Sequence, residues 1–195
     1  MPAAYDPSTA LVVVDVQNDF ADPDGSLFVD GGDEVVGVVN DEIEAARAAG
    51  AFVVYTQDWH PSQTPHFTTE GGVWPVHCVR GTWGAELHPD LDVDGPVVRK
   101  GTGGEDGYSG FSMSDPVNGE VTPTGLDELL RGRSVGRVAV VGLALDVCVK
   151  ATALDAVRLG YACEVITAAS AAVEVEPGDG DRAIAEMAAA GVEIR

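Results

Sequence analysis

The length, composition and charge of this chain exclude several classes of protein. Its 195 residues suit one domain, and 45% hydrophobic against 22% charged residues indicates a globular chain and not a disordered one. The 32 acidic and 11 basic side chains leave a formal net charge of −21, which repels phosphate backbones and anionic lipid. We therefore expect neither nucleic acid nor a membrane surface as a partner.

The N-terminal residues, the length of the apolar runs and the number of cysteines indicate the cellular compartment. Residues 1–6 lack the basic start and long apolar stretch of a signal peptide, and the run at residues 10–14 is too short to span a bilayer. We therefore expect a cytoplasmic protein. Three cysteines, Cys78, Cys148 and Cys163, argue against a disulfide framework, so at least one thiol is expected to be free.

Short apolar runs alternate with helical patterns along the chain. Strands are predicted over residues 10–15, 51–56, 96–100, 137–143, 163–168 and 192–194. Helices are predicted over residues 33–49, 123–130, 147–159 and 180–190, with Thr122 as N-cap and Pro123 as first residue of the second helix. Unbroken apolar strands between helices indicate a mainly parallel β-sheet that helices cover on both faces. The predicted fold is therefore α/β, as a single domain over residues 1–195.

Polar side chains follow several of these strands. In open parallel sheets, ligands bind beyond the carboxyl ends of the strands. The residues at these positions are Asp15, Asp58, His60, Lys100, Asp146 and Cys148. Residues 57–97 carry few regular signals, and loops of that length inside a domain are usually functional. We therefore expect the functional site at this edge of the sheet.

Cys148 is the candidate nucleophile. It follows the strongest predicted strand by five residues and opens a predicted helix, where the helix dipole favours a thiolate over a thiol. A cysteine between Val147 and Val149 is more often a packing residue, and Cys163, within a strand, is expected to be one. The polar residues at the neighbouring strand ends favour the catalytic interpretation for Cys148.

Asp15 and Lys100 are the charged candidates. Asp15 ends the first apolar run, and a carboxylate there needs a partner or a raised pKa, either of which suits a general base. Each residue could also have a purely structural role. Asp15 could cap a loop, and Lys100 could be a solvated lysine at a strand end. The following loop, GTGGEDGYSG, lacks the GxxxxGK[ST] pattern of a nucleotide-binding loop, so we exclude nucleotide binding.

Histidines form the candidate metal site. His60, His66 and His77 fall within eighteen residues, close to Asp58. Imidazoles with one carboxylate suit a divalent ion such as Zn, Mn or Fe(II). Cys78, a soft ligand next to His77, is left out because an additional reactive thiol would be an oxidation liability. The alternative is a polar loop with incidental histidines.

Five motifs together resemble those of the nicotinamidases, within the isochorismatase-like cysteine hydrolases. They are VVVDVQNDF, DWHxxxxxHF, WPVHC, RKG followed by GYSGF, and GLALDVCVKATALDA. They occur in the family's order and extend from Asp15 to about Ser170. Leu145 and Val147 depart from the pattern, because a small polar residue and an aromatic residue or histidine are more common there. This leaves the exact substrate open.

The resemblance implies a three-layer α/β/α fold and a role for each matching residue. The catalytic triad falls on Asp15, Lys100 and Cys148, and the metal ligands fall on Asp58, His60 and His77, with His66 matching a ligand found only in some members. The peptide bond between Leu143 and Ala144 is expected to be cis, with an oxyanion hole formed by the N–H groups of Ala144 and Cys148. Phe20, Trp74 and Tyr108 match aromatic walls of the pocket.

The expected reaction is hydrolysis of nicotinamide, and also of pyrazinamide, through a cysteine thioester, with one divalent ion, zinc first. The small amide is the expected partner, and the sequence leaves monomer and homo-oligomer open. One alternative is an amide or ureido hydrolase of the same superfamily that acts on a carbamoyl amine; such relatives generally lack the full metal set. Another is a catalytically silent member with a binding or assembly role. Isochorismatase itself is disfavoured, because its site does not keep the nucleophilic cysteine.

Overall fold

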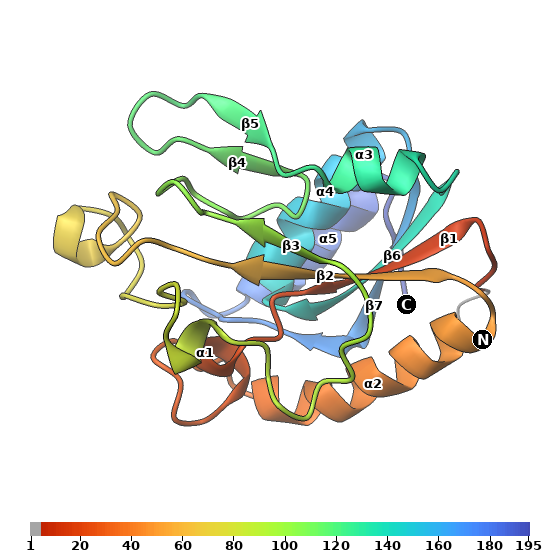
Figure 1. Ribbon diagram of the computed structural model, residues 1–195, viewed down its shortest axis with the longest axis horizontal. Helices are drawn as coiled ribbons and strands as arrows, with labels where there is room; N and C mark the ends of the chain where they lie inside the picture. The colour runs from red at the N-terminus through yellow and green to blue at the C-terminus, as the bar shows by residue number, and fades with distance from the viewer. Residues whose placement is uncertain (1–4) are drawn as a thin grey trace.

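Six parallel strands form the central sheet of the computed structural model, which describes residues 5–195 (Figure 1). In spatial order they are β3 (Val97–Lys100), β2 (Phe52–Asp58), β1 (Thr9–Val14), β6 (Arg137–Leu143), β7 (Ala162–Ala171) and β8 (Glu193–Ile194). All neighbours pair in parallel, as the unbroken apolar runs predicted. The sheet therefore brings the carboxyl ends of β1, β2, β3 and β6 to one edge.

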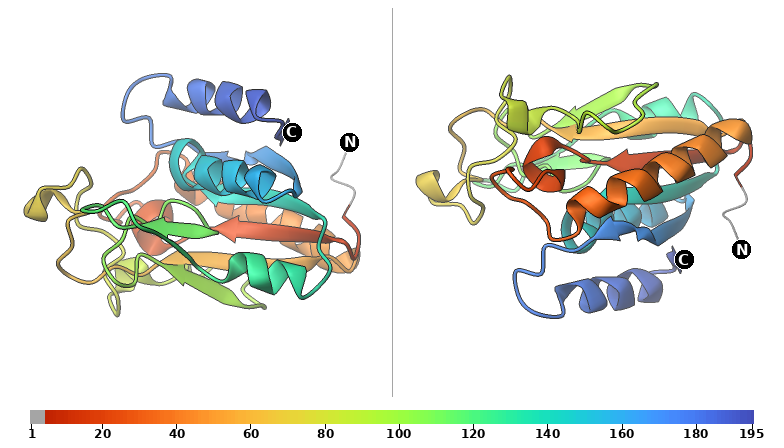
Figure 2. Two further views of the ribbon diagram at one scale, coloured as in Figure 1. Left: turned by 90° about the horizontal axis from the view of Figure 1, so that it is seen from above. Right: turned by 90° about the horizontal axis from the view of Figure 1, so that it is seen from below.

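Helices cover both faces of this sheet, which confirms the predicted three-layer α/β architecture (Figure 2). On one face lies α2 (Gly32–Ala48), against Leu11 and Val13 of β1. On the other lie α3 (Leu126–Arg131), α4 (Lys150–Arg158) and α5 (Asp179–Ala189). The alternate residues of β1 face this second core, because successive side chains of a strand point to opposite faces.

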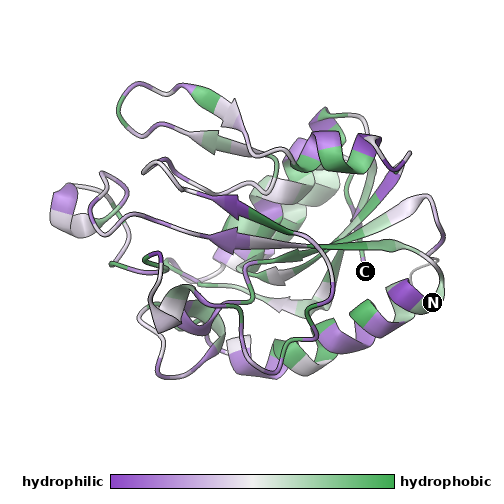
Figure 3. Cartoon of the chain, in the orientation of Figure 1, coloured by the Kyte–Doolittle hydropathy of each residue, from purple (hydrophilic) through white to green (hydrophobic). Residues whose placement is uncertain are grey.

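Hydrophobic residues are concentrated on the central strands and are mixed with hydrophilic ones along α2 (Figure 3). Such mixing is typical of a helix with one buried face. Among residues 5–195, no helix has the length and apolar character that crossing a bilayer requires. Cys78, Cys148 and Cys163 are buried and are free thiols within this described part.

The helix predicted over residues 123–130 begins later than expected, and the predicted Thr122 N-cap is wrong. Thr122 and Pro123 instead belong to β5 (Val121–Pro123), which pairs antiparallel with β4 (Ser112–Ser114). The chain then turns at Gly125, whose φ of 96° is open to glycine, before α3 starts. Tertiary pairing of the hairpin therefore overrides the local helix-start signal.

The long segment after β2 folds over the carboxyl edge of the sheet. It contains two short 3-10 helices, η1 (Thr68–Glu70) and η2 (Trp83–Ala85), and packs near the short helix α1 (Asn18–Ala21). Gln17 holds these parts together: its side-chain amide donates to the carbonyl oxygens of Asp58 and Ala85 and accepts from the Asp58 N–H. The segment is thereby fixed against the end of β2.

Gly142 is a point where the sheet admits no side chain. Its φ is 109°, and a Cβ at this position would lie 2.1 Å from the Val14 carbonyl oxygen of the neighbouring strand. We expect Gly142→Ala to lower the free energy of unfolding by about 3 kcal/mol, because both the backbone and β1 must move. Urea unfolding measures the change. The matched control is Gly37→Ala in α2, where a Cβ meets nothing within 4 Å and helix propensity predicts a gain of about 1 kcal/mol; equal effects of the two changes would contradict this account.

Candidate active site

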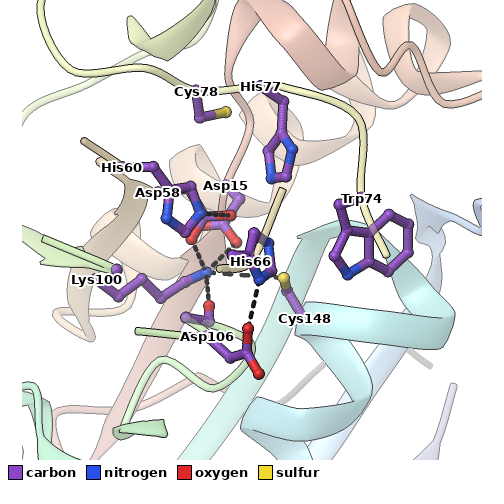
Figure 4. Close-up of polar contacts among 12 residues, drawn as sticks. Asp15, Asp58, His60, His66, Trp74, His77, Cys78, Lys100, Asp106 and Cys148 are labelled. Carbon is purple, nitrogen blue, oxygen red and sulfur yellow. Dashed lines mark hydrogen bonds and ion pairs between the residues drawn. The ribbon is translucent and has the colours of Figure 1, made fainter. Parts of the chain in front are cut away.

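Lys100 lies between two carboxylates at the carboxyl edge of the sheet (Figure 4). Its Nζ is 2.6 Å from Asp15 Oδ2 and 2.6 Å from Asp58 Oδ1, and it donates a hydrogen bond to the Gly107 carbonyl oxygen. Thr56 Oγ1 donates to the second Asp15 oxygen at 2.7 Å. Lys100 and Asp15 are both 0% exposed, so the interpretation of Lys100 as a solvated strand-end residue is wrong.

Burial and charge pairing set the protonation of this group. Burial raises the pKa of Asp15 to about 6, against the opposing effect of Lys100. Burial also acts to raise the pKa of Asp58, but Lys100 and His60 outweigh it and the pKa falls below its usual range. The pKa of Lys100 is well above its ordinary value because Asp15 and Asp58 together outweigh burial. Asp58 is therefore ionised, Lys100 is charged, and Asp15 is suited to exchange a proton near neutral pH.

Cys148 lies next to this charged group. It belongs to a π-helical turn, Leu145–Val149, that leads into α4. Its Sγ is 3.7 Å from Lys100 Nζ, and its ligand atom lies within 4.8 Å of those of Asp15 and Asp58. The sheet thus brings Asp15, Lys100 and Cys148, which are far apart in sequence, close together in space.

The thiol of Cys148 is protonated in the free protein. Burial raises its pKa well above the ordinary value, and Asp15 and Asp58 add to this effect while Lys100 opposes it. Burial and the two carboxylates therefore oppose the thiolate that the helix start was expected to favour. Attack by sulfur needs a base, and Asp15 is the nearest one suited to the task.

The backbone before Cys148 has the form that the resemblance implied. The peptide bond between Leu143 and Ala144 is cis, and Ala144 lines the same pocket as Cys148. Asp146, expected near the chemistry, has another position: its carboxylate accepts hydrogen bonds from the N–H groups of Val173 and Glu174. Asp146 therefore anchors the loop after β7 to the cysteine turn.

A pocket opens over Cys148. It is lined by Phe20, Leu27, Asp58, His66, Trp74, His77, Gly107, Tyr108, Ala144, Val147, Cys148 and Val173. The three predicted aromatic residues are all in its wall, and Trp74 Nε1 donates to the Tyr108 hydroxyl at 3.0 Å. The walls are mainly apolar, which suits a small flat ring with a polar group directed at Cys148.

Besides Gly107, two apolar residues of the pocket, Leu27 and Val173, were missed from the sequence. Each is a single apolar residue in an irregular loop, where no periodicity marks a buried position. Val147, one of the two departures from the family's pattern, also lines the pocket, whereas Leu145 packs in the core beneath the turn. One of the two departures therefore lies in the pocket wall and the other in the core.

His60, His66 and His77 form a buried cluster, of which His66 and His77 line the pocket. Each offers a ligand atom within 4.8 Å of the others, and the rings of His60 and His66 are stacked at 4.7 Å. Asp58 Oδ2 lies 3.8 Å from His60 Nε2. The sheet edge and the long loop thus bring together all four residues expected to bind a metal.

The protonation and hydrogen bonding of these rings suit a divalent cation. Burial lowers the pKa of His77 to about 4 and also lowers that of His66, so both are neutral ligands at pH 7. Among residues 5–195, neither ring nitrogen of His60 has a hydrogen-bond partner although the ring is fully buried. An unpaired buried polar group is costly, and a bound cation would remove that cost.

Comparison with known proteins agrees with this geometry. The isochorismatase domain matches residues 9–195. The chain belongs to the isochorismatase family. It is 39% identical to the nicotinamidase of Escherichia coli, over 96% of this chain and 94% of that protein.

Two solved structures of isochorismatase-family folds are similar to the whole chain. The pyrazinamidase of Pyrococcus horikoshii in complex with zinc superimposes with a TM-score of 0.84 and 39% identity, covering 97% of this chain and 99% of that one. PnC1 from L. infantum in complex with nicotinate superimposes with a TM-score of 0.88 and 36% identity, covering 100% and 96%.

Proposed function

We propose that this protein is a nicotinamidase, which hydrolyses nicotinamide, and also pyrazinamide, to the carboxylic acid and ammonia. One observation carries the proposal: an apolar pocket is lined both by the thiol of Cys148, which lies beside a buried Asp–Lys pair, and by His66 and His77, two of the three clustered histidines. A flat pyridine carboxamide fits this arrangement, with its amide at Cys148 and its ring nitrogen at the histidines. Chain-wide identity to a nicotinamidase supports the same substrate.

In the proposed mechanism, Asp15 takes the proton of Cys148 as Sγ attacks the amide carbon. The N–H groups of Ala144 and Cys148 stabilise the oxyanion, and Lys100 keeps Asp15 in place. Collapse breaks the C–N bond, and ammonia leaves with the proton from Asp15. Asp15 then takes a proton from water, whose oxygen attacks the thioester. The C–S bond breaks, the carboxylic acid leaves, and Asp15 returns its proton to Sγ. Asp58, His60, His66 and His77 would hold a divalent ion, zinc first and Mn or Fe(II) as alternatives, which supplies a Lewis-acid anchor for the ring nitrogen.

Two other functions lead to different assays. A ureido hydrolase would release ammonia from a carbamoyl amine and not from nicotinamide, and a catalytically silent binding protein would release none from either. The buried Asp15, Lys100 and Cys148 disfavour the silent protein, and the histidine cluster disfavours the ureido hydrolase. Ammonia release from nicotinamide by the purified protein decides among the three.

Removing the metal should stop hydrolysis but leave the thiol reactive. His60→Ala removes a cluster ligand without touching Lys100, whereas Asp58 contacts both the cluster and Lys100 and is a poorer choice. We expect the chelated wild type and His60→Ala to lose nicotinamide hydrolysis by about two orders of magnitude or more. Iodoacetamide should still label Cys148, because Asp15 remains available as the base. Ammonia release and mass spectrometry of the labelled protein measure the two effects.

Matched controls separate metal loss from damage to the fold. His88→Ala should keep activity, because His88 lies outside the cluster and only accepts a hydrogen bond from the Asp90 N–H. Adding Zn, Mn or Fe(II) should restore the chelated wild type. Full activity in protein verified to be metal-free would show that the histidines are a structural cluster, and the ring-nitrogen anchor would be abandoned.

A further inference from the structure

Asp106 lies in the loop after β3 and contacts one residue of the histidine cluster, His66, without lining the pocket itself. Its Oδ1 lies 2.5 Å from Nδ1 of His66 (Figure 4). The side chain of Asp106 is 22% exposed, whereas that of His66 is 3% exposed. Of the three clustered rings, only His66 has a charged hydrogen-bond partner within residues 5–195: His77 Nδ1 lies 2.7 Å from the Pro75 carbonyl oxygen, and His60 has no partner.

The loop of Asp106 holds the main chain of His66 as well as its ring. Thr64 Oγ1 accepts from the His66 N–H at 3.2 Å and donates to the Gly104 carbonyl oxygen at 2.6 Å. The loop is itself fixed to the β4–β5 hairpin by two backbone hydrogen bonds. The Asp106 N–H donates to the Ser114 carbonyl oxygen at 2.7 Å, and the Ser114 N–H donates to the Asp106 carbonyl oxygen at 3.0 Å. The position of the Asp106 carboxylate is therefore set by a hairpin outside the main sheet.

This contact decides which nitrogen of His66 is left free to bind a cation. An ionised carboxylate only accepts hydrogen bonds, so Nδ1 carries the proton and Nε2 keeps its lone pair. A carboxylate on the remote nitrogen also orients the ring and makes the other nitrogen a stronger donor to a cation. The Pro75 carbonyl oxygen also orients the ring of His77, but it carries no full charge and so strengthens the other nitrogen less.

We propose that Asp106 is a positioning residue that fixes the tautomer and orientation of His66, makes its Nε2 the fourth protein ligand of the metal site, and so sets the affinity for a divalent cation. The proposal rests on the metal site of the proposed function. It concerns binding, so it is tested without measuring hydrolysis.

The experiment measures zinc binding to metal-free, full-length protein by competition with a chromophoric chelator. We expect Asp106→Ala to weaken zinc binding by about 10- to 100-fold. Asp106→Asn should lose less, because its amide oxygen can still accept the hydrogen bond from Nδ1. In the His66→Ala background, Asp106→Ala should have no further effect, since its contribution acts through that ring. Visible spectra of the Co(II)-loaded proteins should change in the same way in Asp106→Ala and His66→Ala.

Glu105→Ala is the matched control. Glu105 is the adjacent carboxylate of the same loop, and its side chain accepts from the Gly103 N–H and not from a histidine. We expect this change to leave zinc affinity and the Co(II) spectrum unchanged. Thermal unfolding of each apo protein checks that the loop change has not altered the fold.

Three results would overturn the proposal. Wild-type affinity in Asp106→Ala would show that the contact does not affect the metal. An equal loss of affinity in the His66→Ala background would show that Asp106 acts through the loop and not through His66. A wild-type protein that binds neither zinc nor cobalt would remove the metal site of the proposed function as well, which distinguishes that failure from the first two.

Discussion

Cys148→Ala is expected to eliminate nicotinamide turnover while the protein remains folded. The change removes one buried sulfur atom from the pocket wall, so only a small part of the core packing is lost. It also removes the atom that must bond to the amide carbon, and neither Cys78 nor Cys163 lines the pocket. We expect a loss on the order of 10⁴- to 10⁶-fold in kcat, as for other covalent nucleophiles.

Two further cysteine variants control this result. Cys148→Ser should be nearly as inactive, because Asp15, with a pKa of about 6, is a weak base for the far less acidic hydroxyl. Cys163→Ser should keep its rate but lose stability, since Cys163 is buried in β7 away from the pocket. Ammonia release and urea unfolding measure the two quantities. Retained turnover in purified Cys148→Ala would end the covalent mechanism.

Lys100→Met is expected to lower both kcat and stability. Lys100 is the cation between two buried carboxylates, so its removal leaves Asp15 and Asp58 as like charges in a poorly solvated space. Asp15 would then be held protonated and could not accept the thiol proton. We expect kcat to fall by roughly a hundred- to a thousand-fold, and the free energy of unfolding to fall by about 3–5 kcal/mol.

The stability loss in Lys100→Met should depend on pH in a defined direction. Without the cation, the folded pKa of both aspartates rises above the unfolded value of about 3.9. A carboxyl group with a raised folded pKa adds stability below its unfolded pKa, and this is lost as pH rises through the folded pKa. The difference from the wild type should therefore grow from about pH 4 to pH 8. Urea unfolding of metal-free proteins across that range measures it.

Lys150→Met is the matched control for this experiment. Lys150 is the chain's other lysine, and it makes a partly exposed pair with Glu186 at 3.3 Å. Its loss should change stability by about 1 kcal/mol or less and leave the pH dependence unaltered. Normal activity in Lys100→Met, or a stability loss that is constant with pH, would show that Lys100 does not control the charge of Asp15.

The sequence by itself determined the order and type of the main elements and the edge of the sheet that carries the chemistry. Apolar runs such as residues 137–143 are read correctly because burial on both faces of a parallel sheet requires them. Asp15, Lys100 and Cys148 could be named as candidates because parallel strands bring their carboxyl ends together. The clustering of histidines near Asp58 added the metal site, and the resemblance to the family added the aromatic wall residues.

The tertiary structure alone decided how those side chains are paired and protonated. Lys100 meets Asp58 across 42 positions of sequence and Cys148 across 48, so its burial is decided by packing between separate strands and loops. The same holds for Asp106, which contacts His66 across 40 positions of sequence. The β4–β5 hairpin that fixes the loop of Asp106 was not predicted, because local signals assigned part of β5 to a helix. Local sequence patterns report the environment of a residue's neighbours along the chain, whereas charge pairing and pKa depend on neighbours in space. For this reason the residues of the site were predictable, but the protonated thiol, the buried Lys100 and the contact between Asp106 and His66 were not.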